Sequence, residues 1–205
     1  MTSQSDKLTE AKQLVYEYFW RLCGDALLCS RMSDIVAIRN FQKNECILEA
    51  GERTTHIYLV LKGLVRGFYI DASGSEITKC FARENEWCCS YSYMTDEPSP
   101  FFVETLEDTM LAGFSHVRSR EILDSSSRLR TAMEKLLSGA LLQVEKRSMS
   151  FAAMEAKDRY RCFLTENPDL AKRVKQEYIA SYLGITPSSL SRIKRTLILP
   201  NGNDK

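Results

Sequence analysis

Residues 176–195 read Gln-Glu-Tyr-Ile-Ala-Ser-Tyr-Leu-Gly-Ile-Thr-Pro-Ser-Ser-Leu-Ser-Arg-Ile-Lys-Arg, and this segment constrains the fold more than any other. Ile179, Ala180 and Leu183 fall on one face of a short predicted helix, in which the small Ala180 lets a second helix cross closely. Gly184 follows and can supply the positive φ of a tight turn. The segment therefore predicts a helix, a turn and a second helix.

The second predicted helix begins directly after this turn. Thr186 can cap its N-terminus, and Pro187 fits its first turn because the amides there have no partner within the helix. Leu190 and Ile193 form its buried side. Together the two helices and the glycine turn have the pattern of a helix-turn-helix.

The exposed face of the second helix carries hydroxyl groups and positive charges. Small hydroxyl side chains at its N-terminal end let a helix enter the major groove of DNA, and Arg192 can pair with N7 and O6 of guanine. Lys175, before the first helix, suits a phosphate group. The residues expected to contact DNA are Thr186, Ser188, Ser189, Ser191, Arg192, Lys194, Arg195 and Lys175. The alternative is a generic helical hairpin with a solvated charged face, which the combination of small residue, glycine, cap and basic face disfavours.

Positive charge is concentrated near the C-terminal end of the chain. The 205 residues carry 28 basic and 27 acidic side chains, but residues 156–205 alone hold 10 basic and 5 acidic ones. A basic segment on an acidic body is the layout expected of a chain whose basic part meets a polyanion. The hydrophobic content of 44% is typical of a globular protein and excludes a disordered tail, a collagen-like fibre or a bulk polycation.

The first part of the chain changes from a helical to a β-favouring pattern. Residues 1–40 read as helical, with a short second helix predicted over residues 31–39. From residue 41 onward, short apolar runs are separated by turns that contain glycine or proline. These runs are 46–48, 57–61, 64–70, 77–81, 101–105 and 110–114. Strands at such regular spacing predict an antiparallel sandwich or barrel.

A second helical pattern follows residue 115. Six residues recur with a 4-3-4-3-4 spacing, namely Met133, Leu137, Ala140, Val144, Arg147 and Phe151. The spacing makes one narrow seam along a helix of about 25 residues, as in helices that pair with a partner helix. We therefore predict self-association through Met133, Leu137, Ala140 and Val144, although the polar Arg147 interrupts the seam. The alternative is that the helix packs on its own β domain through Leu136 and Leu141.

The chain as a whole resembles the Crp/Fnr family of bacterial transcription regulators over about residues 20–199. Residues 41–52, 57–65 and the turn at 71–76 are similar to the opening of the family's cyclic-nucleotide-binding β-roll. The seam helix matches the family's dimerisation helix. The Ala-Lys-Asp-Arg-Tyr stretch at 156–160 is similar to the start of its DNA-binding domain.

The resemblance implies an α+β fold with an N-terminal antiparallel, jelly-roll-like β-roll, a long dimerisation helix and a C-terminal helix-turn-helix domain. We place these parts at residues 1–117, 118–153 and 154–205. It further implies a cytoplasmic homodimer that reads a two-fold symmetric site in double-stranded DNA, with RNA polymerase as a further partner. Only ten residues follow Arg195, so little or no β-hairpin wing is expected.

The cyclic-nucleotide motif of the family is degenerate in this chain. Members that bind cyclic AMP carry a Gly-Glu pair on the ribose and an Arg-Ser or Arg-Thr pair on the phosphate. Here Cys89 and Ser90 align with the first pair, and Ser99 and Pro100 align with the second. Loss of such a charged contact costs about 2–5 kcal/mol, so we expect another effector, still unidentified, or none.

The tentative effector pocket is apolar and aromatic. Its expected residues are Trp87, Cys88, Cys89, Ser90, Tyr91, Ser99 and Phe101. The alternative is that these side chains only fill the former cavity, since aromatic residues are ordinary core material. Cys88 and Cys89 could sense redox state, but intracellular cysteines are mostly small buried hydrophobes.

Other functions have less support in the sequence. We expect no metal or cofactor, because His56 and His116 have no partners at ligand spacing and no Cys-x-x-Cys pair exists. We expect no enzyme, because there is no Gly-rich phosphate loop and no histidine near a nucleophile. No apolar run reaches the roughly 18 residues of a membrane span. The alternative function is an effector- or redox-sensing module that acts through protein contacts, against which the basic face of 186–195 argues.

Overall fold

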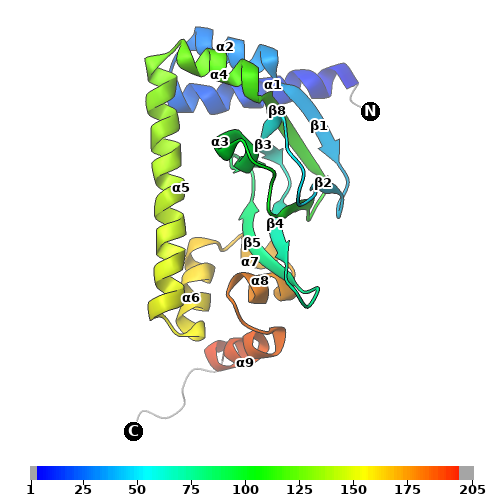
Figure 1. The fold of residues 1–205 in the computed structure, drawn as a ribbon, viewed down its shortest axis with the longest axis vertical. Coiled ribbons are helices and arrows are strands. Elements are labelled where there is room, and N and C mark those ends of the chain that lie inside the picture. Colours follow the sequence, from blue (N-terminus) through cyan, green and yellow to red (C-terminus); the bar gives the residue numbers. More distant parts are fainter. Residues whose placement is uncertain (1–3, 199–205) are drawn as a thin grey trace. The chain divides into compact units, whose positions relative to one another are not determined.

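The computed structural model describes residues 4–198 (Figure 1). The helices are α1 (Gln4–Cys23), α2 (Ala26–Ile35), α3 (Tyr91–Thr95), α4 (His116–Asp124), α5 (Ser127–Ala153), α6 (Ala156–Glu166), α7 (Leu170–Arg173), α8 (Gln176–Tyr182) and α9 (Pro187–Ile198). The strands are β1 (Ala37–Phe41), β2 (Cys46–Leu48), β3 (His56–Lys62), β4 (Val65–Ile70), β5 (Glu76–Ala82), β6 (Trp87–Cys88), β7 (Phe102–Thr105) and β8 (Thr109–Ser115). The chain forms two compact units. Unit 1 contains residues up to 69 and residues 80–139, and unit 2 contains residues 70–79 and those from 140 onward.

The β-roll consists of two antiparallel sheets. Among residues 4–198, each sheet has four strands, in the orders β1-β8-β3-β6 and β2-β7-β4-β5. Strand β3 pairs with β8 so that Ile57 lies opposite Phe114, and β4 pairs with β7 so that Gly67 lies opposite Val103. The predicted α+β fold with an antiparallel β-roll is confirmed.

The prediction of a helix over residues 31–39 is wrong for its second half, residues 36–39. Helix α2 begins one turn earlier than expected, because the Asp25 carboxylate caps it by accepting a hydrogen bond of 3.1 Å from the amide of Leu28. The helix ends at Ile35, and Val36 is extended with φ −71° and ψ 136°. The following residues form β1, whose amides and carbonyls pair with β8.

The first sheet is covered on both faces, because successive residues of a strand point to opposite sides. Leu59 of β3 belongs to a core cluster with Phe19 of α1 and Met32 of α2. Val60, the next residue, belongs to a second cluster with Val103 of the other sheet. Helices α1 and α2 therefore close one face of the roll, and the second sheet closes the other.

Helix α5 is the predicted long helix, and its character changes along its length. Near its start, Leu129 and Ala132 are buried. Further along, Leu137, Leu141 and Val144 are 44%, 68% and 66% exposed. Large apolar side chains therefore line an open surface of this helix.

The C-terminal unit contains the predicted helix-turn-helix. Ile179 and Ala180 of α8 are fully buried, and Leu190 of α9 is 1% exposed. Gly184 has φ +67°, and the amide of Ile185 donates to the carbonyl of Ala180 at 3.0 Å, which closes the turn between the helices. The expected absence of a wing concerns residues 199–205, which lie outside the described part of the chain.

Candidate nucleic-acid interface and effector pocket

Thr186 organises the N-terminus of α9. Its hydroxyl accepts a hydrogen bond of 3.2 Å from the amide of Ser189, and its carbonyl accepts one of 3.0 Å from the amide of Leu190. The same hydroxyl lies 2.9 Å from the hydroxyls of both Ser188 and Ser189. The predicted cap is therefore present, and its hydroxyl also contacts the hydroxyls of the two serines that follow it.

One face of α9 presents both hydroxyls and free cations. Ser188, Ser191, Arg192 and Arg195 are all exposed and recur at three- and four-residue spacing, which places them on one side of the helix. The Arg192 side chain has no hydrogen-bond or ion-pair partner within residues 4–198. The guanidinium of Arg192 can therefore form new hydrogen bonds without first breaking an intramolecular one.

Two of the expected DNA-contacting lysines have partners within the chain. Lys194 is half-buried, and its ammonium donates a hydrogen bond of 3.0 Å to Oε1 of Gln176 at the start of α8. Lys175 is exposed, lies 3.6 Å from Glu177 and sits over the ring of Tyr178 at 5.4 Å. Lys194 therefore links the two helices beside the exposed face of α9, whereas Lys175 stands at the N-terminal end of α8.

Two arginines that sequence reasoning did not assign to the site support the turn between α8 and α9. Nε of Arg159 donates to the carbonyl of Leu183 at 3.2 Å, and Nη1 donates to the carbonyl of Met154 at 2.7 Å. Arg147 donates to the carbonyl of Tyr182 at 3.0 Å. The polar Arg147 in an otherwise apolar seam was the one sequence signal that could have indicated this role.

The four residues expected in the dimer seam do not share one environment. Met133 lines a cavity inside unit 1. Leu137, Ala140 and Val144 are exposed, and so is Leu141 beside them. The open apolar surface of α5 thus begins at residue 137, one helical turn later than the sequence pattern suggested.

The residues aligned with the cyclic-nucleotide motif lie in and beside the second core cluster. Cys88, Cys89 and Phe101 are buried there, and Tyr91 meets Phe101 edge-on at 6.0 Å. The hydroxyl of Ser99 donates to the carbonyl of Phe101 at 2.8 Å. These side chains therefore contact one another within the interior of the roll.

Cys89 has a backbone conformation that is unusual for its side chain. Its φ of +57° lies in the left-handed region that favours glycine. Ser90, which follows it, is half-buried at the start of α3. The position at which the resemblance implies a glycine thus has a glycine-type backbone.

The thiol of Cys88 is protonated at neutral pH. A hydrogen bond with Cys89, burial, and the nearby Cys89 and Cys80 raise the pKa of Cys88 well above its usual range. A thiol in this state is a poor nucleophile, because the thiolate is the reactive form.

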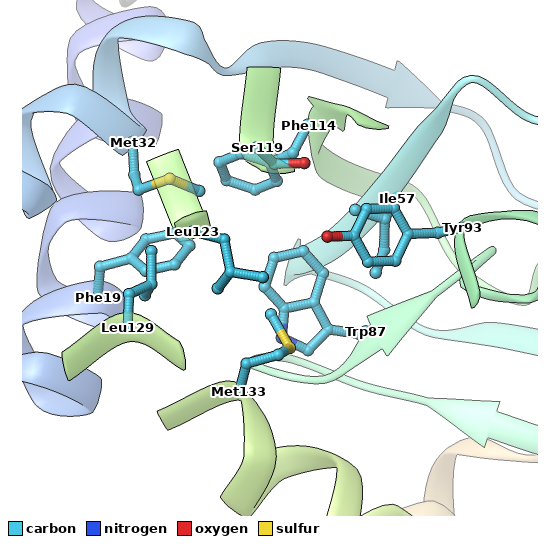
Figure 2. Close-up of a pocket in the computed structure, with 10 residues that line it drawn as sticks. All are labelled: Phe19, Met32, Ile57, Trp87, Tyr93, Phe114, Ser119, Leu123, Leu129 and Met133. Atoms are coloured by element: carbon cyan, nitrogen blue, oxygen red, sulfur yellow. The ribbon is translucent and has the colours of Figure 1, made fainter. Parts of the chain in front are cut away.

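Trp87 lies on the other side of the first sheet from Cys88, Tyr91 and Phe101. Its indole Nε1 donates a hydrogen bond of 2.6 Å to the hydroxyl of Tyr18. Figure 2 shows it lining a cavity of about 30 Å³ with side chains from α1, α2, α3, α4, α5 and the sheet. The lining residues are Phe19, Met32, Ile57, Trp87, Tyr93, Phe114, Ser119, Leu123, Leu129 and Met133. The tentative effector residues are therefore divided between this cavity and the interior of the roll.

Within residues 4–198, no group of three or more His, Cys, Asp or Glu side chains is arranged to hold a metal ion. None of the described helices has the length and apolar character needed to cross a bilayer.

Comparison with known proteins agrees with this architecture. Residues 38–126 match the cyclic nucleotide-binding domain. An anaerobic regulatory protein of Aggregatibacter actinomycetemcomitans is 20% identical over 166 residues. That match covers 74% of this chain and 63% of the relative, so the chain spans less than two thirds of the relative's length.

Solved structures share the fold of most of the chain. The c-di-GMP-responsive global regulator CLP from Xanthomonas campestris is 17% identical with a TM-score of 0.71, and the match covers 85% of this chain and 92% of that one. FixK2 from Bradyrhizobium japonicum is also 17% identical with a TM-score of 0.71, over 83% and 90% of the two chains. Residues 38–126 are therefore similar to the cyclic nucleotide-binding domain, and the chain shares the fold of these regulators, which is the fold that the resemblance to the Crp/Fnr family implied.

Proposed function

We propose that this chain is a DNA-binding transcription regulator of the Crp/Fnr type, which binds double-stranded DNA as a homodimer. The observation that carries the proposal is the exposed face of α9, with Ser188, Ser191, Arg192 and Arg195 on one side of a helix whose other side is buried at Leu190. A helix with small residues at its N-terminal end and free arginines further along suits the major groove.

We assign the contacts on this face to two classes. Arg192 is the base-reading residue, because a guanidinium can donate two hydrogen bonds to guanine, and each such pair contributes roughly 1–3 kcal/mol of discrimination. Lys175, exposed at the end of α8, contacts a phosphate and so adds affinity without sequence preference. Lys194 supports the helix pair through Gln176 and stands at the edge of the interface.

The homodimer is proposed from the open apolar surface of α5. Leu137, Leu141 and Val144 follow a 4-3 spacing and are each more than 40% exposed. Exposed apolar side chains in such a row are typical of a helix that pairs with a second helix, and a two-fold axis along α5 would make the partner a second copy. Two copies of α9 would then read half-sites about 10–10.5 base pairs apart.

The β-roll is proposed to act without cyclic AMP. The aligned phosphate position holds Ser99 and Pro100, and the Ser99 hydroxyl is already bound to a backbone carbonyl. Without a cation at this position, a cyclic phosphate would lose its hydration and gain no charged partner.

The test is selection of bound duplexes from a random DNA pool, followed by titration of the selected and random duplexes. Arg192→Ala should lose discrimination at one guanine, about tenfold or more at that position, while Lys175→Ala should weaken all duplexes alike and reduce the salt dependence. Arg161→Ala, on the exposed side of α6, is the matched control and should change neither. Failure to enrich any sequence with the wild-type chain would overturn the proposal.

A further inference from the structure

The guanidinium of Arg147 donates hydrogen bonds to three backbone carbonyls of unit 2. Its Nη2 donates to the carbonyls of Thr78 at 3.2 Å and of Tyr182 at 3.0 Å, and Nη1 donates to the carbonyl of Lys79. Thr78 and Lys79 belong to β5, whereas Tyr182 is the last residue of α8. One side chain of α5 therefore joins a strand to the first helix of the helix-turn-helix.

The guanidinium of Arg147 is also held by aromatic rings. Its central carbon lies 4.2 Å from the ring centroid of Tyr182 and 5.4 Å from that of Phe151. A planar guanidinium can stack and donate along its edge at the same time, which the ammonium of a lysine cannot do.

Ser181 provides a second connection between the same two elements. Its hydroxyl accepts a hydrogen bond of 2.8 Å from the amide of Thr78 and donates one of 3.1 Å to the carbonyl of Glu76. Thr78 is fully buried. The start of β5 is thus bound to the last turn of α8 by two hydrogen bonds between its backbone and the Ser181 hydroxyl, in addition to those of Arg147.

The residues that make these contacts are joined along the chain to the roll on one side and to α9, the second helix of the helix-turn-helix, on the other. Toward the roll, Cys80 follows Lys79 in β5. Its Sγ lies so close to Gly67 of β4 that a Cβ added to that glycine would come within 2.9 Å of the sulfur. In the other direction, Tyr182 is separated from the turn residue Gly184 by one residue. A displacement of β5 by one residue would therefore change the partners of α8.

We propose that Arg147, together with Ser181, is a positioning residue for DNA recognition: it fixes the end of α8 to residues 76–79 of β5, and so sets how α9 is presented to DNA. This inference rests on the proposed DNA-binding function. Arg147 contacts no DNA in this proposal. It raises the fraction of molecules whose helix-turn-helix is ready to bind, and apparent affinity scales with that fraction.

The experiment compares Arg147→Ala, Arg147→Lys and Ser181→Ala with the neighbouring exposed Lys146→Ala as the matched control. Hydrogen exchange of the DNA-free protein should speed up at residues 76–79 and 176–184 in the first three variants only, with the Thr78 amide the most sensitive site in Ser181→Ala. Affinity of Arg147→Ala for a selected duplex should fall about 10- to 100-fold, the range expected for losing hydrogen bonds to a charged donor. Affinity for random duplex should fall by a similar factor, because the same fraction of ready molecules limits binding to every duplex. The salt dependence should stay as in the wild type, because no phosphate contact is removed.

Two results would overturn the inference. Unchanged hydrogen exchange in both Arg147 variants would show that Arg147 does not hold β5 to α8. If circular dichroism shows that the alanine variant does not fold, the exchange of Arg147→Lys decides the question. A lower salt dependence for Arg147→Ala than for the wild type would make Arg147 a direct phosphate contact instead. Absence of any DNA binding by the wild type would overturn the proposed function, while the exchange measurement would still decide the contact.

Discussion

Phe151 lies so close to Gly184 that a Cβ on the glycine would come within 2.7 Å of Cε1 of the phenylalanine. Gly184 also has φ +67°, a conformation that other residues rarely adopt. The turn of the helix-turn-helix therefore depends on glycine for two reasons, one conformational and one steric, and α5 contributes the residue that imposes the second.

Gly184→Ala should lower the free energy of unfolding of unit 2 by more than the cost of backbone strain alone. Left-handed strain for a residue with a Cβ is about 1–2 kcal/mol, and overpacking against Phe151 adds about 1–3 kcal/mol. Gly74→Ala is the matched control, because Gly74 has φ +81° in the same unit but nothing lies within 4 Å of an added Cβ. Thermal unfolding followed by circular dichroism measures both, and equal effects of the two variants would refute the steric part.

Leu137→Glu should convert the proposed dimer to a monomer. The change would place like charges in a buried contact between symmetry-related helices, where an uncompensated charge costs several kcal/mol. Ser138→Glu adds the same charge at the next exposed position and should leave the dimer intact. Sedimentation velocity distinguishes the two species. An unchanged dimer in Leu137→Glu would mean that another surface forms the pair.

Cyclic AMP should bind weakly or not at all. The missing charged contact at Ser99 and Pro100 costs about 2–5 kcal/mol, which exceeds the roughly 1–3 kcal/mol that stacking on an aromatic ring such as Tyr91 can supply. Isothermal titration calorimetry with the purified protein gives the answer directly. A low-micromolar dissociation constant would show that the alignment of Ser99 and Pro100 with the phosphate-binding pair is wrong.

Acidification from pH 7.5 to 5.5 should reduce the stability of unit 1. Burial lowers the pKa of His56, with Arg39 adding to the effect, and burial likewise lowers the pKa of His116. Nε2 of His116 is buried without a hydrogen-bond partner within residues 4–198. In the unfolded chain both histidines have a pKa of about 6.5 and take up protons first, so the stabilisation is present above pH 6.5 and is lost as the pH falls.

Urea unfolding followed by tryptophan fluorescence measures this effect in unit 1 alone, because Trp20 and Trp87 are both in that unit. The free energy of unfolding should decrease on acidification in the wild type. It should decrease less in the double variant His56→Gln with His116→Gln. The same pH dependence in both proteins would assign it to carboxylates instead.

Local sequence patterns were enough for most of the strands and for the helix-turn-helix, because short apolar runs between turn residues indicate a strand, and the glycine, cap and apolar positions of a helix-turn-helix lie within one short segment. Strand β2 occupies the predicted residues 46–48, and the glycine, cap and apolar positions of 176–195 have the predicted structural roles, except that Ile193 is half-buried where a buried side chain was predicted. Strand β1 was missed because residues 37–41 become a strand only through pairing with β8, about seventy residues away. Tertiary pairing of this kind overrides local propensity.

The candidate site was less predictable for the same reason. Trp87 and Cys88 are adjacent in sequence and were expected in one pocket, but β6 directs them to opposite sides of the sheet. Arg147 occupies a seam position in the heptad pattern, yet its partners are backbone carbonyls of β5 and α8 that no side-chain pattern encodes. Contacts to backbone groups of distant segments leave little trace in a single sequence.

The left-handed conformation of Cys89 has an evolutionary consequence. A cysteine codon becomes a glycine codon by one base change, and that change would relieve a strain of about 1–2 kcal/mol. The surrounding roll imposes this backbone conformation, since a residue with a Cβ, such as Cys89, disfavours it. A descendant of this protein with glycine at this position would therefore gain the strain relief and lose the packing of a buried side chain, so that the two effects on stability oppose each other.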